Sequence, residues 1–313
     1  MKKLICLVLA LLTALCFAGC SSCSSSTASP DGSYWLKTPT TMTVSHLEER
    51  ATYSVTVTKF KDGEITPNLS GTYTTYLTTC TLPEDTNIYY CLETSLTLSG
   101  TYTYEETTYP VNDSVNSIVV FMGADKKLKP VKSTKSMVST SPILDDSGNI
   151  AFDTFDFSYE IDYSGKHAKV TYTDNTEDKN AEFPASKTFK NFYSSTFCEN
   201  ELLTMYPRMF DRSSSFDLSL KTLNAANQKM ETIKVSTSSY EKEMAENYWN
   251  KPNFMVDCLQ FYKSGTYTGI AIKAYYANKE EALAKQVLVK METGIANVGT
   301  MTYTLTSFST DQY

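Results

Sequence analysis

The sequence predicts a mainly β protein, built on a curved antiparallel sheet or half-open β-barrel with one to three short helices. Three observations support this fold class. Beyond Pro30, apolar residues alternate with Thr, Ser or charged residues at a period of two, the spacing of side chains on one face of a strand. β-Branched and aromatic residues dominate these runs. The turns between them are short and contain Gly, Asp or Asn, which favours antiparallel hairpins over crossovers.

The strands are expected to follow one another with few interruptions. Residues 51–60 place Tyr53, Val55 and Val57 on one face, and the Asp62-Gly63 pair that follows is a turn signal. Further strands are predicted at 71–82, 88–98, 100–109, 114–122, 128–139, 150–163, 166–173, 216–223, 229–237, 254–263, 266–276, 286–293 and 298–308. The tetrapeptide Gly-Thr-Tyr-Thr begins at Gly71, Gly100 and Gly265, and we interpret it as turn-and-strand chemistry at the start of a strand.

Helical patterns are few. At 197–210, Leu202, Met205 and Met209 have helical spacing, although Pro207 interrupts the run. Short helices are also predicted at 240–249 and 279–285. With so little helix, the apolar face of the sheet must be buried by curling or by a second sheet.

The first twenty residues have the features of a secretion signal. Lys2 and Lys3 precede an uncharged apolar run at 4–17, which is too short to span a bilayer but typical of a signal peptide. The residues Phe17-Ala18-Gly19-Cys20 resemble the bacterial lipobox, although its first position is usually Leu. That resemblance implies cleavage before Cys20, acylation of its thiol and attachment to the extracytoplasmic face of the cell membrane. The alternative is an ordinary secretory signal that is cut near Ala18.

Four segments are expected along the chain. A lipoprotein signal peptide at 1–19 is followed by a flexible Ser-rich tether at 20–33. A β half at 34–180 and a second at 181–313 form either one continuous domain or two halves related by duplication. The second possibility rests on an echo between 121–132 and 276–290, each with an aromatic strand end, a charged loop and a strand carrying Val and Lys.

Composition and motifs argue against several functions. The net charge of −7 does not suit a nucleic-acid-binding protein. The chain has two histidines, His46 and His167, which leaves little scope for histidine-based catalysis or a zinc site. It contains no Gly-x-Ser-x-Gly elbow, His-Glu-x-x-His pair, P-loop or Rossmann glycine pattern. We therefore expect no enzyme, no catalytic residues, no cofactor and no metal.

Four cysteines beyond the tether are candidates for disulfides in an exported protein. Cys80 and Cys91 flank the loop at 83–87, and a register that places them opposite each other makes a cross-strand disulfide plausible. Cys198 and Cys258 would then be left to pair with each other. Buried free thiols are the alternative.

The order of elements in the C-terminal third provides a second resemblance. A short apolar element at 201–210 contains Arg208, a strand ends in Tyr275-Tyr276, and strands at 286–291 and 294–308 follow a charged loop. Across 197–308 this order resembles an uncharacterised bacterial envelope family that is grouped with half-open β-barrel lipoprotein carriers. Those carriers usually have Pro before the Leu-Lys of the penultimate strand, where this chain has Gln286. The resemblance implies a concave face, covered by short helices, that holds an acyl chain or lipid.

Two interpretations of function follow. The first is a membrane-anchored, non-enzymatic lipoprotein that binds a hydrophobic or amphiphilic ligand on its concave β face, unless side chains fill that face. The second is a β-sandwich surface lipoprotein that binds glycan or a partner protein through aromatic residues at its edges. The aromatic pairs in question are Tyr34-Trp35, Tyr89-Tyr90, Tyr248-Trp249 and Tyr275-Tyr276.

The lipobox resemblance generates a direct prediction. Cys20→Ser is expected to move the protein from the membrane fraction to the soluble fraction, because acyl chains on Cys20 would be its only anchor and an acidic domain is repelled by anionic lipid. Fractionation after a salt wash measures this. A variant that stays with the membrane would contradict the lipid anchor.

Overall fold

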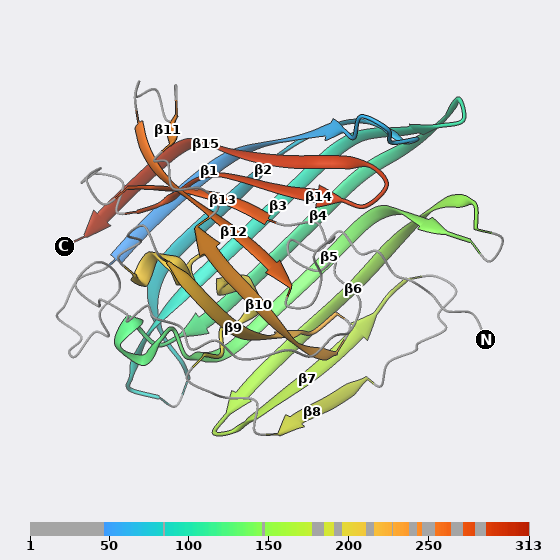
Figure 1. Ribbon diagram of the computed structural model, residues 1–313. Helices are drawn as coiled ribbons and strands as arrows, with labels where there is room; N and C mark the ends of the chain where they lie inside the picture. Colours follow the sequence, from blue (N-terminus) through green and yellow to red (C-terminus); the bar gives the residue numbers. More distant parts are fainter. Residues whose placement is uncertain are drawn as a thin grey trace.

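The computed structural model describes residues 47–312, except for positions 84, 146–147, 177–184, 191–195, 211–215, 227, 238–242, 246–253, 264–271 and 279–285 (Figure 1). The described residues form fifteen strands and three short 3-10 helices, in one antiparallel sheet. The helices are η1 (Ala124–Lys126), η2 (Asn200–Leu202) and η3 (Tyr206–Met209). The strands are β1 (Leu47–Lys59), β2 (Thr66–Thr81), β3 (Ile88–Tyr104), β4 (Thr107–Phe121), β5 (Pro130–Leu144), β6 (Ile150–Ser164), β7 (His167–Asp174), β8 (Ser186–Lys190), β9 (Asp217–Asn224), β10 (Lys229–Thr237), β11 (Glu243–Ala245), β12 (Phe254–Lys263), β13 (Ile272–Ala277), β14 (Leu288–Ile295) and β15 (Gly299–Gln312).

The sheet consists of two meanders. They are joined in the middle of the sheet, where the first strand, β1, pairs with the last strand, β15. Strands β1 to β8 pair in sequence order, and so do β9 to β15 except that β10 pairs directly with β12, which also pairs with the short β11. Strand β1 pairs with β15 along its whole length, from Leu47 opposite Gln312 to Lys59 opposite Gly299. The order therefore runs from β8 at one edge to β9 at the other. The strands of both predicted β halves belong to this one sheet.

One face of the sheet is apolar and the other is polar. In β1, Ala51, Tyr53 and Val55 are buried, while Ser54 and Thr56 between and beside them are exposed. Strands β2 and β3 have 16 and 17 residues, well beyond the usual length, so the natural twist accumulates along them. Figure 1 shows β9, β10 and β12 crossing in front of β4 to β7, so that the two ends of the sheet face each other. The prediction of a curved antiparallel sheet is confirmed, and the β-sandwich alternative is wrong because the described strands form one sheet.

Two of the Gly-Thr-Tyr-Thr glycines lie at a close approach between β2 and β3. A Cβ added to Gly71 would lie 1.9 Å from the carbonyl oxygen of Thr97, and one added to Gly100 would lie 2.0 Å from that of Asn68. Gly100 also has a φ of +138°, which L side chains rarely adopt. The interpretation of these glycines as strand starts is wrong: both lie inside strands, where the backbones leave no room for a side chain.

The predicted helices need two corrections. Within 197–210 the chain forms the 3-10 helices η2 and η3 and not a longer helix, with Pro207 at the start of η3. In the region predicted as a helix at 240–249, the described residues 243–245 are strand β11, which pairs with β12. The third predicted helix, 279–285, lies outside the described residues.

Candidate functional site

The segment 197–210, called the plug below, lies inside the curved sheet. Every residue of the plug is buried except Glu201 and Thr204, which are partly buried. Its helix η2 contacts both β4 and β9, which places the plug between the facing ends of the sheet. Its apolar side chains share one core cluster with the concave face, and they are Phe197, Leu202, Leu203, Met205, Tyr206, Met209 and Phe210.

The plug holds its own backbone by local hydrogen bonds. Within it, the amides of Leu202, Met205 and Arg208 each donate to the carbonyl oxygen three residues earlier. Its start joins the edge strand β9, where the amide of Cys198 donates to the carbonyl of Lys221. Further along, the plug meets the sheet through side chains, for example where Tyr276 Oη donates to the carbonyl of Thr204 at 2.8 Å. The plug is thus attached to the concave face mainly by side-chain contacts.

Two buried ion pairs fix the plug to the N-terminal strands. Arg208 donates from Nη1 and Nη2 to the two carboxylate oxygens of Glu49 in β1, at 2.6 and 2.8 Å. Both side chains are at most 2% exposed. Lys135 of β5 donates to Glu201 Oε1 at 2.7 Å, and these side chains are 1% and 6% exposed. A two-pronged Arg–carboxylate bond fixes orientation as well as distance, so these pairs define where the plug sits.

Glu199 is a third buried acid at the start of the plug. Its Oε2 accepts a hydrogen bond from the amide of Glu201 at 2.6 Å and so caps η2. Burial first, and then the nearby charge of Glu201, raise the pKa of Glu199 to about 7. The hydrogen bonds from the Glu201 amide and from Ser133, and the charge of Lys135, act in the opposite direction with smaller effects. Burial also raises the pKa values of Tyr159 and Tyr163, which stay protonated beside it. Near neutral pH the plug therefore contains a carboxyl that changes charge.

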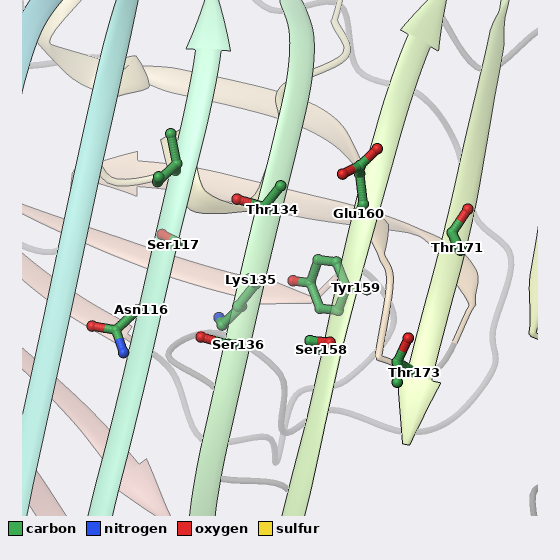
Figure 2. Close-up of a pocket in the computed structure, with 11 residues that line it drawn as sticks. Asn116, Ser117, Thr134, Lys135, Ser136, Ser158, Tyr159, Glu160, Thr171 and Thr173 are labelled. Atoms are coloured by element: carbon green, nitrogen blue, oxygen red, sulfur yellow. The ribbon is translucent and has the colours of Figure 1, made fainter. Parts of the chain in front are cut away.

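The opposite, outer side of the same strands carries a polar groove. It has a volume of about 490 Å³ and crosses β4, β5, β6 and β7 (Figure 2). Its lining from the outer face is Asn116, Ile118, Thr134, Ser136, Ser158, Glu160, Thr171 and Thr173. Ser117, Lys135 and Tyr159 complete the lining and belong to the inner face, so groove and plug lie on the two sides of the same part of the sheet.

The structure does not contain the predicted disulfides: Cys80, Cys91, Cys198 and Cys258 are all reduced thiols. The register of β2 and β3 places Cys80 opposite Tyr89, and Cys91 opposite Thr78. The two thiols are therefore diagonal neighbours and not opposite each other. A hydrogen bond between them lowers the pKa of Cys80, and the same bond together with burial raises that of Cys91.

Cys198 and Cys258 are too far apart to be joined. Cys198 lies beside Lys221 of β9, which pairs with Thr232 of β10. Cys258 precedes Leu259, which pairs with Thr237 of β10. Five residues of strand separate these positions, roughly 16 Å at about 3.3 Å per residue. A disulfide requires Cα atoms within about 7 Å of each other.

The remaining candidates are buried, with the exception of His167, or lie outside the described residues. Tyr89, Tyr90, Tyr275 and Tyr276 are all buried, so these aromatic pairs offer no exposed rings for a glycan. His167 is exposed at the start of β7. The described residues contain no group of three or more metal-ligating side chains and no helix able to span a membrane. Cys20, His46, Tyr34-Trp35 and Tyr248-Trp249 lie outside the described residues.

Comparison with known proteins adds one structural likeness. No family model matches the chain, and no curated protein matches its sequence. The chain is similar to the crystal structure of a β-barrel-like protein, the domain of unknown function DUF1849 from Brucella abortus. The identity is 10%, the match covers 85% of this chain and 98% of that one, and the TM-score is 0.47. Functional inference therefore rests on this chain's own residues.

Glu199 predicts a pH dependence of stability. Because its pKa is raised in the folded state, the folded chain keeps a proton that the unfolded chain loses above about pH 4.5. The free energy of unfolding is expected to be highest below that pH and to fall as pH rises to about 7, by on the order of 3 kcal/mol from this carboxyl. Urea unfolding at a series of pH values measures the fall.

The control for this prediction is Glu199→Gln, whose amide oxygen can still cap η2 but does not titrate. The difference in unfolding free energy between the wild type and this variant should change across pH 4.5–7. Burial raises the pKa of Asp113 to about 6, so Asp113 also lowers the unfolding free energy as pH rises. This effect is the same in the wild type and the variant, so it cancels when their unfolding free energies are subtracted. A difference that is constant with pH would show that Glu199 ionises normally.

The absence of a disulfide between Cys80 and Cys91 predicts how many reactive thiols the denatured protein contains. When denatured without reductant, the Cys80→Ser/Cys91→Ser double variant should have two fewer reactive thiols than the wild type, because the register leaves both sulfurs unbridged. A chromogenic thiol reagent provides the count. Equal counts would mean that these two cysteines form a disulfide in the protein.

Proposed function

We propose that this chain is a non-enzymatic binding protein, anchored through acylated Cys20 to the extracytoplasmic face of a bacterial membrane. Its ligand is hydrophobic or amphiphilic and occupies the concave face of the sheet, in the place that the plug covers. The observation that carries the proposal is the attachment of the plug: a segment held mainly by side chains covers the apolar face that a second sheet or a closed strand ladder covers in other β proteins.

The composition of the plug suits a segment that takes the place of an apolar ligand. Its Phe, Leu and Met side chains cover the concave face without adding strands to the sheet. The sheet is open, since β8 and β9 are its two edges and do not pair with each other. Withdrawing the plug therefore breaks few backbone hydrogen bonds of the sheet and leaves the strands in register.

The buried charges set how firmly the plug is held. Buried ion pairs often contribute less stability than apolar residues of the same volume, and their best-attested role is to select one arrangement among several. Here they fix the plug in one position by contacts from Glu49 and Lys135 to Arg208 and Glu201. Removing one partner leaves a buried unpaired charge, which favours the state with the plug withdrawn.

This proposal predicts the effect of Lys135→Met on ligand binding. Apparent affinity is reduced by the fraction of molecules in which the site is covered, so a loosened plug should strengthen binding. A fluorescent fatty acid is expected to bind Lys135→Met about tenfold or more tightly than the wild type. The matched control is Lys126→Met, which removes an exposed ion pair with Asp125 and should bind as the wild type does.

Mass spectrometry of solvent extracts from natively purified protein provides the second measurement. A defined lipid at near one molecule per chain would support binding on the concave face and identify the ligand class. The proposal fails if extracts are empty and the fatty acid binds neither the wild type nor Lys135→Met, since the plug is then a permanent part of the core.

A further inference from the structure

The outer side of the N-terminal strands carries a regular array of small, uncharged polar side chains. Across β1, β2, β3 and β4, three successive rows of directly paired residues consist of Ser, Thr and Asn alone. We call this array the hydroxyl face. Its rows are Thr52, Thr74, Ser95 and Asn116; Ser54, Thr72, Thr97 and Ser114; and Thr56, Ser70, Ser99 and Asn112.

The first row continues beyond these strands. Asn116 pairs with Ser136 of β5, Ser136 with Ser158 of β6, and Ser158 with Thr173 of β7. On the other side, Thr304 and Thr302 of β15 extend the second and third rows. None of these side chains is charged, although one residue in five of the whole chain is charged. The first row therefore crosses seven strands without a charge.

The groove described above lies at the β4–β7 end of this row (Figure 2). Asn116, Ser136, Ser158 and Thr173 line one side of it, and the next row, Ile118, Thr134, Glu160 and Thr171, lines the other. A volume of about 490 Å³ falls within the range of small-molecule sites. The polar outer face of the sheet is thus hollowed over β4 to β7.

The groove combines two features that match a sugar. Ser, Thr and Asn each supply donors and acceptors, as in the bond between Ser95 Oγ and Asn116 Oδ1 at 2.8 Å. Ile118 is one of the few large apolar side chains exposed among the described residues, at 43%, and offers a contact for the C–H face of a sugar ring. Neutral hydroxyl groups also lose hydration at a smaller cost than charged groups do.

Charge argues against other ligands. The outer lining of the groove has one charged side chain, Glu160, which forms an ion pair with Lys132 at 3.0 Å. Lys135 faces inward and is bound to Glu201. An anionic ligand would find no unpaired cation in the groove, and the whole chain is acidic. An apolar ligand would leave the hydroxyl groups without partners.

From these observations we propose that the groove binds an uncharged oligosaccharide and that the hydroxyl face extends this contact along a polysaccharide chain. Strands stand about 4.8 Å apart, which is comparable with the length of one sugar unit, so successive units can meet successive strands. Single hydroxyl contacts are weak, and binding gains strength from their number along the polymer. This site lies on the opposite side of the sheet from the concave face and the plug.

The test is affinity electrophoresis of the full mature chain in gels that contain a neutral polysaccharide. The panel is hydroxyethylcellulose, glycol chitin, xylan and mannan, with polygalacturonate as the anionic comparison. We expect retardation on at least one neutral polymer, and we expect titration calorimetry with the matching hexasaccharide to give an affinity that does not change with salt, because no charges are involved.

Ser136→Tyr is the variant that fills the groove, and Thr58→Tyr is its matched control at an exposed strand position outside it. Tyr suits exposed strand positions, so both variants should unfold at temperatures close to that of the wild type. Ser136→Tyr is expected to weaken binding about tenfold or more, and Thr58→Tyr to leave it unchanged. If Ser136→Tyr does not fold, Ser136→Ala/Ser158→Ala should still weaken binding several-fold.

Three results would overturn the proposal. The first is the absence of retardation on all four neutral polymers. The second is retardation that neither groove variant reduces, which would place binding elsewhere on the chain. The third is retardation on polygalacturonate alone that disappears in high salt, which would indicate an interaction with charge and not with hydroxyl groups.

Discussion

Burial of a single apolar sheet face is the constraint on which the rest of this structure depends. The long strands β2 and β3 present Tyr73, Leu77, Leu92 and Leu96 to one side, and the described residues contain no helix long enough to cover them. The sheet must therefore bury its own apolar face by coiling until its ends face each other. Glycines such as Gly71 allow strands β2 and β3 to approach each other closely within this sheet.

Coiling leaves a space that the plug fills, and this explains the unusual chemistry in the core. A segment that enters a sheet interior without joining the ladder must satisfy its polar groups by local turns and side chains. The local turns are the 3-10 helices η2 and η3. The ion pairs Glu49–Arg208 and Lys135–Glu201 provide part of the side-chain contacts. The raised pKa of Glu199 follows from the same placement, because its carboxyl has been taken out of water.

Strand alternation gives the two faces different chemistry within the same short stretches of sequence. In β5, Lys135 points to the plug and Ser136 to the outer groove. In β4, Ser117 approaches Glu201 on the inside while Asn116 and Ile118 line the groove. A change of register by one residue would exchange the two environments. The contacts of the plug on the inner face and the hydroxyl face on the outer one are thus products of one register, which the turns and the core packing hold in place.

The sequence by itself determined the strands and the alternation of their side chains, because both depend on neighbours along the chain. It predicted the curved antiparallel sheet and most strand positions, but it placed the break in the 197–210 run at Pro207, which lies inside η3. The outward Thr and Ser residues were visible at period two, but their alignment into rows was not. Tertiary structure decided the register of Cys80 and Cys91, which differs by two residues from the pairing that a disulfide requires. It also decided the meeting of Glu49 with Arg208, which lie 159 positions apart. Such choices depend on turn geometry and on packing between distant segments, and no local pattern encodes them.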